Sequence, residues 1–468
     1  MFLPWSYTIL ATLPRKSPRH LFNYRLRLPR HTWDGELPLP QYETTSDPAQ
    51  PMVPLSPEEA ANLPEHFSQY ISGYIFTKVE DPVAVRDEML KKLAEVGALG
   101  RIYLNEDGTN VQMACHPRHS QAVVKIIKSI HGGIFANMRL FTNEIIDTSV
   151  SSPLFDKLSV RIRPLLNDGL PREYSTNLDQ YMEDFNHLSP KQWHEEMTKA
   201  GKDAVILDMR NTYEYEVGAF QNALPVDVPA YRDTFPELDR LLGAPNDEYK
   251  VVNELKVMHS NLSMNEPIVP TPAAPVPKDK KIFIYCTGGI RCLKVGAYLS
   301  NKGYSDVNTL EGGINAYTQF ALKHLKNPME DSLFRGVNVV FDDRRGVRVT
   351  KDVISRCHHC NRPADRHRNC SCDMCDILFI QCKDCETIYN GACSIKCNET
   401  QWGYGDIVRE NIKKHNRAVD ENLKTHKCGP ECAEGHNFSL TKVNLNPAAP
   451  APSMYRPRFV PLTRDIPQ

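Results

Sequence analysis

This 468-residue chain has almost no net charge and no long apolar stretches. The 56 Lys and Arg residues nearly balance the 57 Asp and Glu residues, so the formal net charge is −1 and any contact with nucleic acid must come from a local patch. No run of eighteen apolar residues occurs, which argues against a membrane-spanning helix. Hydrophobic residues make up 41% of the chain, which is enough for packed cores, and the length predicts two or three domains.

Acidic residues are absent from the first 33 positions, which carry only basic charges: Arg15, Lys16, Arg19, Arg25, Arg27 and Arg30. This composition is typical of a mitochondrial transit peptide, and a basic tail is the alternative. The apolar opening precedes these charges, which argues against a secretory signal. Mitochondrial and cytoplasmic locations both stay open. We expect residues 1–70 to be a flexible, Pro-rich segment.

Cysteine is rare before residue 357, and one of the early cysteines, Cys286, stands in a distinctive loop. It follows the apolar run Ile282–Tyr285, which predicts a buried strand, and a helical pattern begins soon after it. The residues between Cys286 and Arg291 are Thr287, Gly288, Gly289 and Ile290. Main-chain amides of such a loop and the start of a helix form an anion cradle that favours the thiolate. Cys286 is therefore a candidate nucleophile, with a buried structural cysteine as the alternative.

Other residues near this loop are candidates for supporting roles. Arg291 is expected to bind an anionic donor or a persulfide. Cys292 could resolve an oxidised Cys286 as a disulfide, although its place in the first helical turn could also point it away. Asp208 and Arg210 end another predicted strand, where we expect an ion pair at the rim of the site, with substrate contact by Arg210 as the alternative.

The Cys-x-x-Gly-x-Arg pattern resembles the active-site loop of the rhodanese sulfurtransferases, and cysteine phosphatases use a longer loop. Further resemblance lies upstream, in Val205–Asn211 and Tyr213–Phe220, and downstream, in Leu310–Ile314. Together these segments are similar to the bacterial oxygen-dependent tRNA uridine hydroxylases and to animal thiosulfate sulfurtransferase-like proteins. The resemblance implies a rhodanese domain over residues 190–326, a parallel α/β sheet with its site at the strand C-termini. We expect the Pro-rich residues 243–280 to be a surface insertion.

Three functions follow as hypotheses. The resemblance implies hydroxylation of the wobble uridine of tRNA, with Cys286 essential and tRNA as partner. The alternative is sulfur transfer from thiosulfate or a persulfide donor protein, with Cys286 as the persulfide carrier. The third is a binding protein with an idle loop, against which the intact Cys-x-x-Gly-x-Arg pattern argues. The sequence does not decide the oligomeric state.

Residues 71–165 form a separate unit, followed by a predicted linker over 166–189. Predicted strands and helices in the order βαββαβ, with Leu158–Ile162 as the fourth strand, favour a ferredoxin-like sandwich. The unit is similar to the acylphosphatase-like N-terminal domain of the same hydroxylases. Its turn at residues 107–110 reads Asp-Gly-Thr-Asn, whereas the turn of those proteins usually reads Glu-Gly-Ile-Asn. Basic residues that could approach RNA phosphates, or form an ordinary solvated face, are Lys125, Lys128, Lys157, Arg161 and Arg163.

Eleven of the fourteen cysteines lie between Cys357 and Cys432, inside a predicted module over residues 335–436. Their spacing predicts four ligand pairs and two structural zinc sites, formed by neighbouring or by interleaved pairs: Cys357 and Cys360, Cys372 and Cys375, Cys382 and Cys385, and Cys393 and Cys397. Lower-ranked ligands are Cys370, Cys428, Cys432 and His436, then His358, His359 and His367. Disulfides are the competing explanation, disfavoured beside a reactive thiolate. We expect Gly336–Arg344 to pack as a strand on the rhodanese core and residues 437–468 to be a disordered tail.

Overall fold

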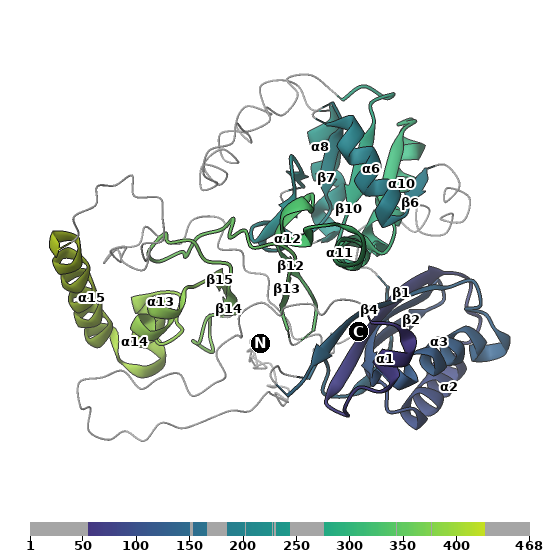
Figure 1. Ribbon diagram of the computed structural model, residues 1–468, viewed down its shortest axis with the longest axis horizontal. Helices are drawn as coiled ribbons and strands as arrows, with labels where there is room; N and C mark the ends of the chain where they lie inside the picture. Colours follow the sequence, from purple (N-terminus) through teal and green to yellow (C-terminus); the bar gives the residue numbers. More distant parts are fainter. Residues whose placement is uncertain are drawn as a thin grey trace, which may run out of the picture.

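A computed structural model describes residues 55–149, 153–165, 185–201, 203–226, 228, 231–243, 276–342, 344–375 and 377–425. Three units follow one another along the chain, coloured purple, teal and green to yellow in Figure 1. Within the described residues, no helix is long and apolar enough to cross a membrane. The basic N-terminal segment, most of the predicted linker and insertion, and the C-terminal tail lie outside the described residues.

The N-terminal domain is a five-stranded sheet with two helices packed on one face. A core that includes Ile71, Met89 and Ile127 joins the sheet to these helices. The strands lie in the order β4-β1-β3-β2-β5, which confirms the ferredoxin-like fold. After a short α1 (Pro57–Ala61), its elements are β1 (Phe67–Phe76), α2 (Pro82–Glu95), β2 (Leu99–Asn105), β3 (Gly108–Cys115), α3 (Ser120–Ser129), β4 (Arg139–Asp147) and β5 (Leu158–Ile162).

The prediction of Leu158–Ile162 as the fourth strand was wrong. The fourth strand is β4, which pairs antiparallel with β1, whereas Leu158–Ile162 is a fifth strand that pairs parallel with β2. The sequence of β4 hid it because Asn143 and Glu144 interrupt the apolar pattern. Both side chains are nevertheless buried, since the sheet face without helices is covered by the rest of the chain.

The second domain is a parallel sheet in the order β6-β11-β10-β7-β9, as predicted for a rhodanese fold. It begins before residue 190, because β6 already pairs with β11. Strand β10 is central and fully buried. The elements are β6 (Asn186–Leu188), α6 (Pro190–Ala200), β7 (Val205–Asp208), α7 (Thr212–Tyr215), β8 (Gly218–Phe220), β9 (Leu224–Pro225), α8 (Thr234–Gly243), β10 (Ile282–Tyr285), α10 (Ile290–Asn301), β11 (Val307–Leu310) and α11 (Gly313–His324).

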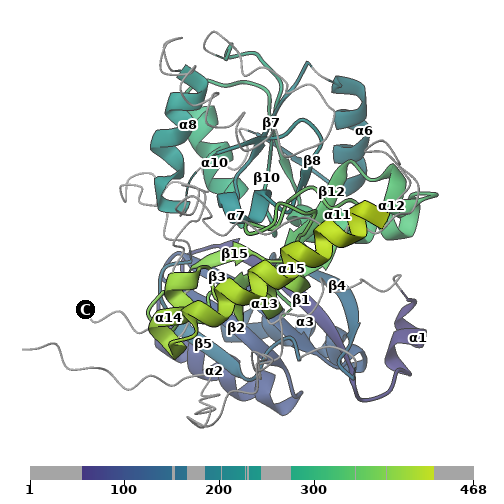
Figure 2. The same cartoon turned by 90° about the vertical axis from the view of Figure 1, so that its left-hand side faces the viewer.

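The C-terminal part first returns to the rhodanese domain and then forms the cysteine module. Strand β12 pairs antiparallel with β8, which confirms the predicted packing of this segment on the rhodanese core. The outermost helix, α15, lies at the left of Figure 1 and is seen along its length in Figure 2. The elements are α12 (Pro328–Asp331), β12 (Phe334–Val339), β13 (Gly346–Arg348), β14 (His367–Asn369), β15 (Leu378–Ile380), α13 (Lys383–Tyr389), α14 (Ile395–Trp402) and α15 (Gly405–Thr425).

The face of the N-terminal sheet that carries no helices docks against the other two units. Tyr74 and Phe76 of β1 pack against the hydrophobic cluster of the rhodanese domain. A buried ion pair joins Glu144 of β4 to Arg344 of the C-terminal segment, and Arg344 also pairs with Asp342. This ion pair links the N-terminal domain to the C-terminal segment, and removing one partner would leave a buried charge uncompensated.

Candidate active site and cysteine clusters

Cys286 stands directly after β10, and α10 begins four residues later. Its side chain is completely buried. The Gly289 amide donates a hydrogen bond of 3.1 Å to the Cys286 sulfur, and Gly289 adopts φ +93°, a conformation that favours glycine. The loop therefore folds around the sulfur, and the predicted cradle forms where the Cys-Thr-Gly-Gly sequence placed it.

The surroundings of Cys286 favour its thiolate form. Burial alone opposes ionisation, because it disfavours the charged form. A hydrogen bond from Cys292, the Arg291 charge and main-chain amides outweigh this effect and lower the pKa of Cys286 to about 6. These surroundings favour the ionised sulfur, and the thiolate is the nucleophilic form of a cysteine.

Cys292 lies next to Cys286 instead of pointing away from it. It is fully buried in the same cluster, and its pKa is raised by burial and by its hydrogen bond to Cys286. The contact between the two cysteines thus acts in opposite directions on their pKa values: it favours the thiolate of Cys286 and the neutral thiol of Cys292. Neither cysteine forms a disulfide.

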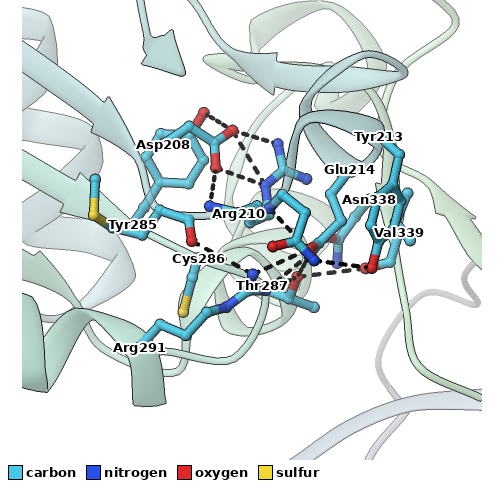
Figure 3. Close-up of polar contacts among 12 residues, drawn as sticks. Asp208, Arg210, Tyr213, Glu214, Tyr285, Cys286, Thr287, Arg291, Asn338 and Val339 are labelled. Atoms are coloured by element: carbon cyan, nitrogen blue, oxygen red, sulfur yellow. Dashed lines mark hydrogen bonds and ion pairs between the residues drawn. The ribbon is translucent and has the colours of Figure 1, made fainter. Parts of the chain in front are cut away.

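Arg291 is held by a partner that the sequence analysis missed, Glu214. Two hydrogen bonds, Nη1 to Oε2 at 2.9 Å and Nη2 to Oε1 at 2.8 Å, join the guanidinium to the fully buried carboxylate (Figure 3). Thr287 donates a further bond of 3.0 Å to Glu214. The expectation that Arg291 binds an anion is therefore qualified, because Glu214 already occupies its two terminal nitrogens.

A signal for Glu214 was present in the sequence. The short helix α7 begins after Asn211, and the Asn211 amide donates a hydrogen bond of 3.1 Å to the Glu214 carboxylate. Asn211-x-x-Glu214 has the spacing of a capping box, which places the side chain of the third helical residue at the helix start. Although burial opposes its ionisation, the Arg291 charge keeps the pKa of Glu214 below its usual value.

Asp208 and Arg210 form the predicted ion pair, but they are buried instead of lying at a rim. Arg210 Nε donates to Asp208 at 2.9 Å, and both side chains are inaccessible to solvent. Tyr285 donates a hydrogen bond of 2.6 Å to the same carboxylate. This pair lies above Cys286 in Figure 3, and its hydrogen bonds connect the ends of β7 and β10, so its geometry supports a structural role.

The clustered cysteines form two groups, each with four sulfur atoms within 4.8 Å of one another. The first group contains Cys357, Cys360, Cys382 and Cys385, and the second contains Cys370, Cys375, Cys393 and Cys397. The pairs are therefore interleaved along the chain, an option that the sequence left open. One ligand is corrected: the second group takes Cys370 where the spacing had indicated Cys372.

The reason for this correction is the turn after β14. The amide of Cys372 donates to the Cys370 sulfur at 3.5 Å, and the amide of Cys393 donates to it at 3.3 Å. Amides directed at a sulfur stabilise a thiolate, so Cys370 has the environment of a metal ligand. Spacing alone could not reveal this, because Cys370 and Cys372 both precede Cys375.

The sulfur separations fit a tetrahedral ion. Cys360 and Cys382 are 3.7 Å apart, and Cys393 lies 3.7 Å from Cys375 and 3.6 Å from Cys397. Four thiolates at about 2.3 Å from a central zinc ion would lie about 3.8 Å from one another. The groups thus have the donor type, number and spacing of metal sites, and the cysteines in both are free thiols and not disulfides.

Apart from Cys370, none of the lower-ranked candidates among the described residues belongs to these groups. Cys428, Cys432 and His436 lie outside the described residues. Among the described histidines, His358 contacts Glu216 at 3.0 Å and His359 packs on the Tyr389 ring.

Three family descriptions match successive parts of the chain: "UPF0176 acylphosphatase like domain" over residues 68–165, "Rhodanese-like domain" over 190–320 and "Rhodanase C-terminal" over 335–398. A tRNA uridine(34) hydroxylase of Enterobacter sp. (strain 638) is 31% identical over 354 residues, which are 75% of this chain and 86% of that protein. The one from Cronobacter sakazakii is 33% identical over the same shares. The chain belongs to the tRNA uridine(34) hydroxylase family.

Among solved structures, the rhodanese-like domain protein of Staphylococcus aureus covers 28% of this chain and 91% of its own, at 19% identity and a TM-score of 0.17. A score this low carries no argument. The match over residues 335–398 is more informative, because both cysteine groups lie within it.

The predicted basic residues do not form one patch. Lys125 and Lys128 belong to α3, on the helical face of the N-terminal sheet. On β5, Val160 points into the core beneath the helices, so the neighbouring Arg161 points to the opposite face. A single RNA-binding surface made of all these residues is therefore not supported.

Proposed function

We propose that this protein hydroxylates the wobble uridine of tRNA with Cys286 as the essential nucleophile. One observation carries the proposal: the relatives named tRNA uridine(34) hydroxylase match over at least 70% of the chain, and the matched part contains a cysteine prepared as a thiolate. Family membership alone would leave the site untested, and a reactive cysteine alone would not identify the substrate.

The surrounding residues have supporting roles in this proposal. The Gly289 amide and the Cys292 thiol stabilise the thiolate, and Arg291 contributes its charge from the side. Glu214 fixes the orientation of Arg291, so it acts as a positioning residue. Resolution of an oxidised Cys286 by Cys292 stays a proposal, which the contact between the two sulfurs supports.

The experiment compares the tRNA of cells that lack the gene with the tRNA of cells that express the wild type or a variant. After digestion to nucleosides, mass spectrometry measures 5-hydroxyuridine derivatives. We expect Cys286→Ala to lower their formation at least about 100-fold. Cys115→Ala is the control, because it removes another buried thiol, which packs in the core of the N-terminal domain and not in the cluster of Cys286. Wild-type levels of these nucleosides with Cys286→Ala, or in cells without the gene, would overturn the proposal.

Sulfur transfer is the second candidate, supported by the rhodanese domain and its short loop between Cys286 and Arg291. In that reaction Cys286 would carry a persulfide received from thiosulfate or a donor protein. Thiocyanate production from thiosulfate and cyanide by the purified protein, together with unchanged wobble nucleosides in cells, would favour it over hydroxylation.

We also propose that each cysteine group holds a structural zinc ion. Four thiolates in a closed set suit zinc, and they leave no open position for substrate. The β14–β15 hairpin and α13 are short elements, so metal coordination would stabilise their arrangement.

A further inference from the structure

A cavity of about 280 Å³ lies between the N-terminal and rhodanese domains, beside the cysteine loop. Its walls come from β1 and β4 on one side and from β6, α10 and the end of β11 on the other. The volume is close to the lower end of the roughly 300–1,000 Å³ range of small-molecule sites. Neither domain forms this cavity alone.

The lining of the cavity combines aromatic rings with a positive charge. Tyr74, Phe76 and Phe141 contribute half-buried rings, and Arg139 stands at the wall with its side chain 72% exposed. Arg139 pairs with Glu311 from the opposite domain. The buried Lys294 ammonium lies 5.8 Å from the centre of the Phe76 ring. Aromatic faces with nearby cations are the surroundings in which an unstacked nucleobase and its phosphate bind.

Tyr74 connects this cavity to the reactive sulfur. Its ring lines the cavity, and its hydroxyl lies 2.8 Å from where a Cβ atom on Gly289 would stand. Gly289 in turn donates its amide to the Cys286 sulfur. Leu293 also lines the cavity and packs in the same cluster as Cys286. The phenol of Tyr74 thus borders both the cavity and the loop that holds the thiolate.

We infer that this cavity receives the target nucleoside of the RNA, flipped out of its stack, and places its base beside Tyr74, next to the loop that holds Cys286. This inference rests on the proposed function and adds its substrate site. The base lies among the three aromatic rings, and Arg139 exchanges Glu311 for the adjoining phosphate. Enzymes that modify a base inside folded nucleic acid take it out of the stack in this way. The acylphosphatase-like domain therefore supplies part of the active site.

The first test uses an anticodon stem–loop RNA with 4-thiouridine at position 34, crosslinked to the full-length protein by light. Peptide mapping by mass spectrometry is expected to place the crosslink on Tyr74, Phe76 or Phe141. A crosslink on another surface, with an RNA that is still hydroxylated, would overturn the site and leave the proposed function standing. A crosslink in the cavity without hydroxylation in any assay would overturn the proposed function and leave the site standing. If neither the cavity crosslink nor hydroxylation is detected, the site and the proposed function are both overturned.

The second test measures steady-state kinetics with the unmodified stem–loop. Loss of one base-stacking ring by Phe141→Ala is expected to raise KM about 10-fold or more. The control is Phe320→Ala, a half-buried aromatic residue of α11 that does not line the cavity, and its KM should change less than about twofold. Equal effects of the two variants on KM, with thermal melting and the pKa of Cys286 unchanged, would overturn the inference.

The charge at the wall is tested by a matched pair of arginines. Arg139 pairs with Glu311 across the domains, whereas Arg118 pairs with Glu65 on the same domain's surface. Arg139→Ala is expected to weaken stem–loop binding, measured by fluorescence anisotropy, about 3-fold or more and to reduce its salt dependence, because one phosphate contact is lost. Arg118→Ala should change neither. Identical affinities for both variants would contradict the phosphate role of Arg139.

Discussion

Cys286 and the eight grouped cysteines of the C-terminal module are all buried or half-buried thiols, yet their surroundings differ in one respect. Cys286 has amides, a thiol and a nearby guanidinium around a single sulfur, and its pKa falls to about 6. The grouped cysteines face one another in fours. A lone stabilised thiolate keeps a lone pair for chemistry, whereas four converging thiolates direct theirs at one point. The arrangement around each sulfur, and not burial itself, separates the proposed nucleophile from the proposed metal ligands.

The largest effect that tests this contrast is the loss of a metal ion. We expect wild-type protein to contain two zinc ions and Cys370→Ser to contain one, with a lower melting temperature. Metal binding is worth about 10–16 kcal/mol in small zinc modules, so its loss should unfold the segment locally. Inductively coupled plasma mass spectrometry gives the metal content. The control is Cys372→Ser, a cysteine two residues away outside the group, which should keep both ions. Equal zinc loss in both variants would show that the ligand set is wrong.

Next in size is the loss of the buried carboxylate beside the loop. Glu214→Gln leaves the Arg291 charge without its partner and should lower the free energy of unfolding by about 3–5 kcal/mol. The pKa of Glu214 is lowered in the fold, so its contribution is present above the usual pKa of 4.5 and is lost as pH falls through the folded value. Denaturant unfolding at several pH values measures this difference.

Glu216→Gln is the matched control, since Glu216 lies in the same turn, half-buried beside His358. It should cost less than about 1 kcal/mol. If both variants lose the same stability, or if the Glu214→Gln difference persists unchanged at low pH, the buried ion pair does not have the assigned role.

The comparison of the two regions also explains what the sequence could predict. The Cys286 cradle lies within six consecutive residues, so its geometry followed from the local pattern of strand, glycines and helix. The second cysteine group contains Cys370 instead of Cys372. This choice depends on the amide of Cys393, which lies 23 residues further along the chain and donates to the Cys370 sulfur. Glu214 pairs with Arg291, although 77 positions separate them in the sequence. Tyr74, which lies beside Gly289, comes from another domain. The local pattern and the family resemblance predicted the fold and the loop around Cys286, but these tertiary partners required the packed structure.

A smaller effect is expected on the ionisation of Cys286. Cys292→Ala removes the thiol that donates to the sulfur, and a hydrogen bond to a charged group is worth about 1.5–3 kcal/mol, or roughly one to two pKa units. The pKa of Cys286 should therefore rise from about 6 toward neutral pH or above. Ultraviolet absorbance of the thiolate during a pH titration, taken as the difference from Cys286→Ala, measures it.

Cys115 provides the control for that titration, because burial raises its pKa to about 12. The difference between wild type and Cys115→Ala should show no thiolate signal near neutral pH. An unchanged pKa of Cys286 in Cys292→Ala would mean that amides and the Arg291 charge alone stabilise the sulfur, and the contrast between the two early cysteines of the loop would disappear.

The smallest effect concerns the backbone of the cradle. Gly289→Ala places a Cβ atom at φ +93° and within 2.8 Å of the Tyr74 hydroxyl, so we expect a loss of about 1–2 kcal/mol in the free energy of unfolding. The amide of residue 289 should also move from the sulfur, which raises the pKa of Cys286. Gly288→Ala is the matched control one residue earlier, because a Cβ there meets nothing within 4 Å. Chemical denaturation measures the free energy of unfolding, and the thiolate titration measures the pKa of Cys286. If the two alanine variants behave alike, the thiolate does not depend on the shape of this loop, and Cys286 would differ from the grouped cysteines only in its number of sulfur neighbours.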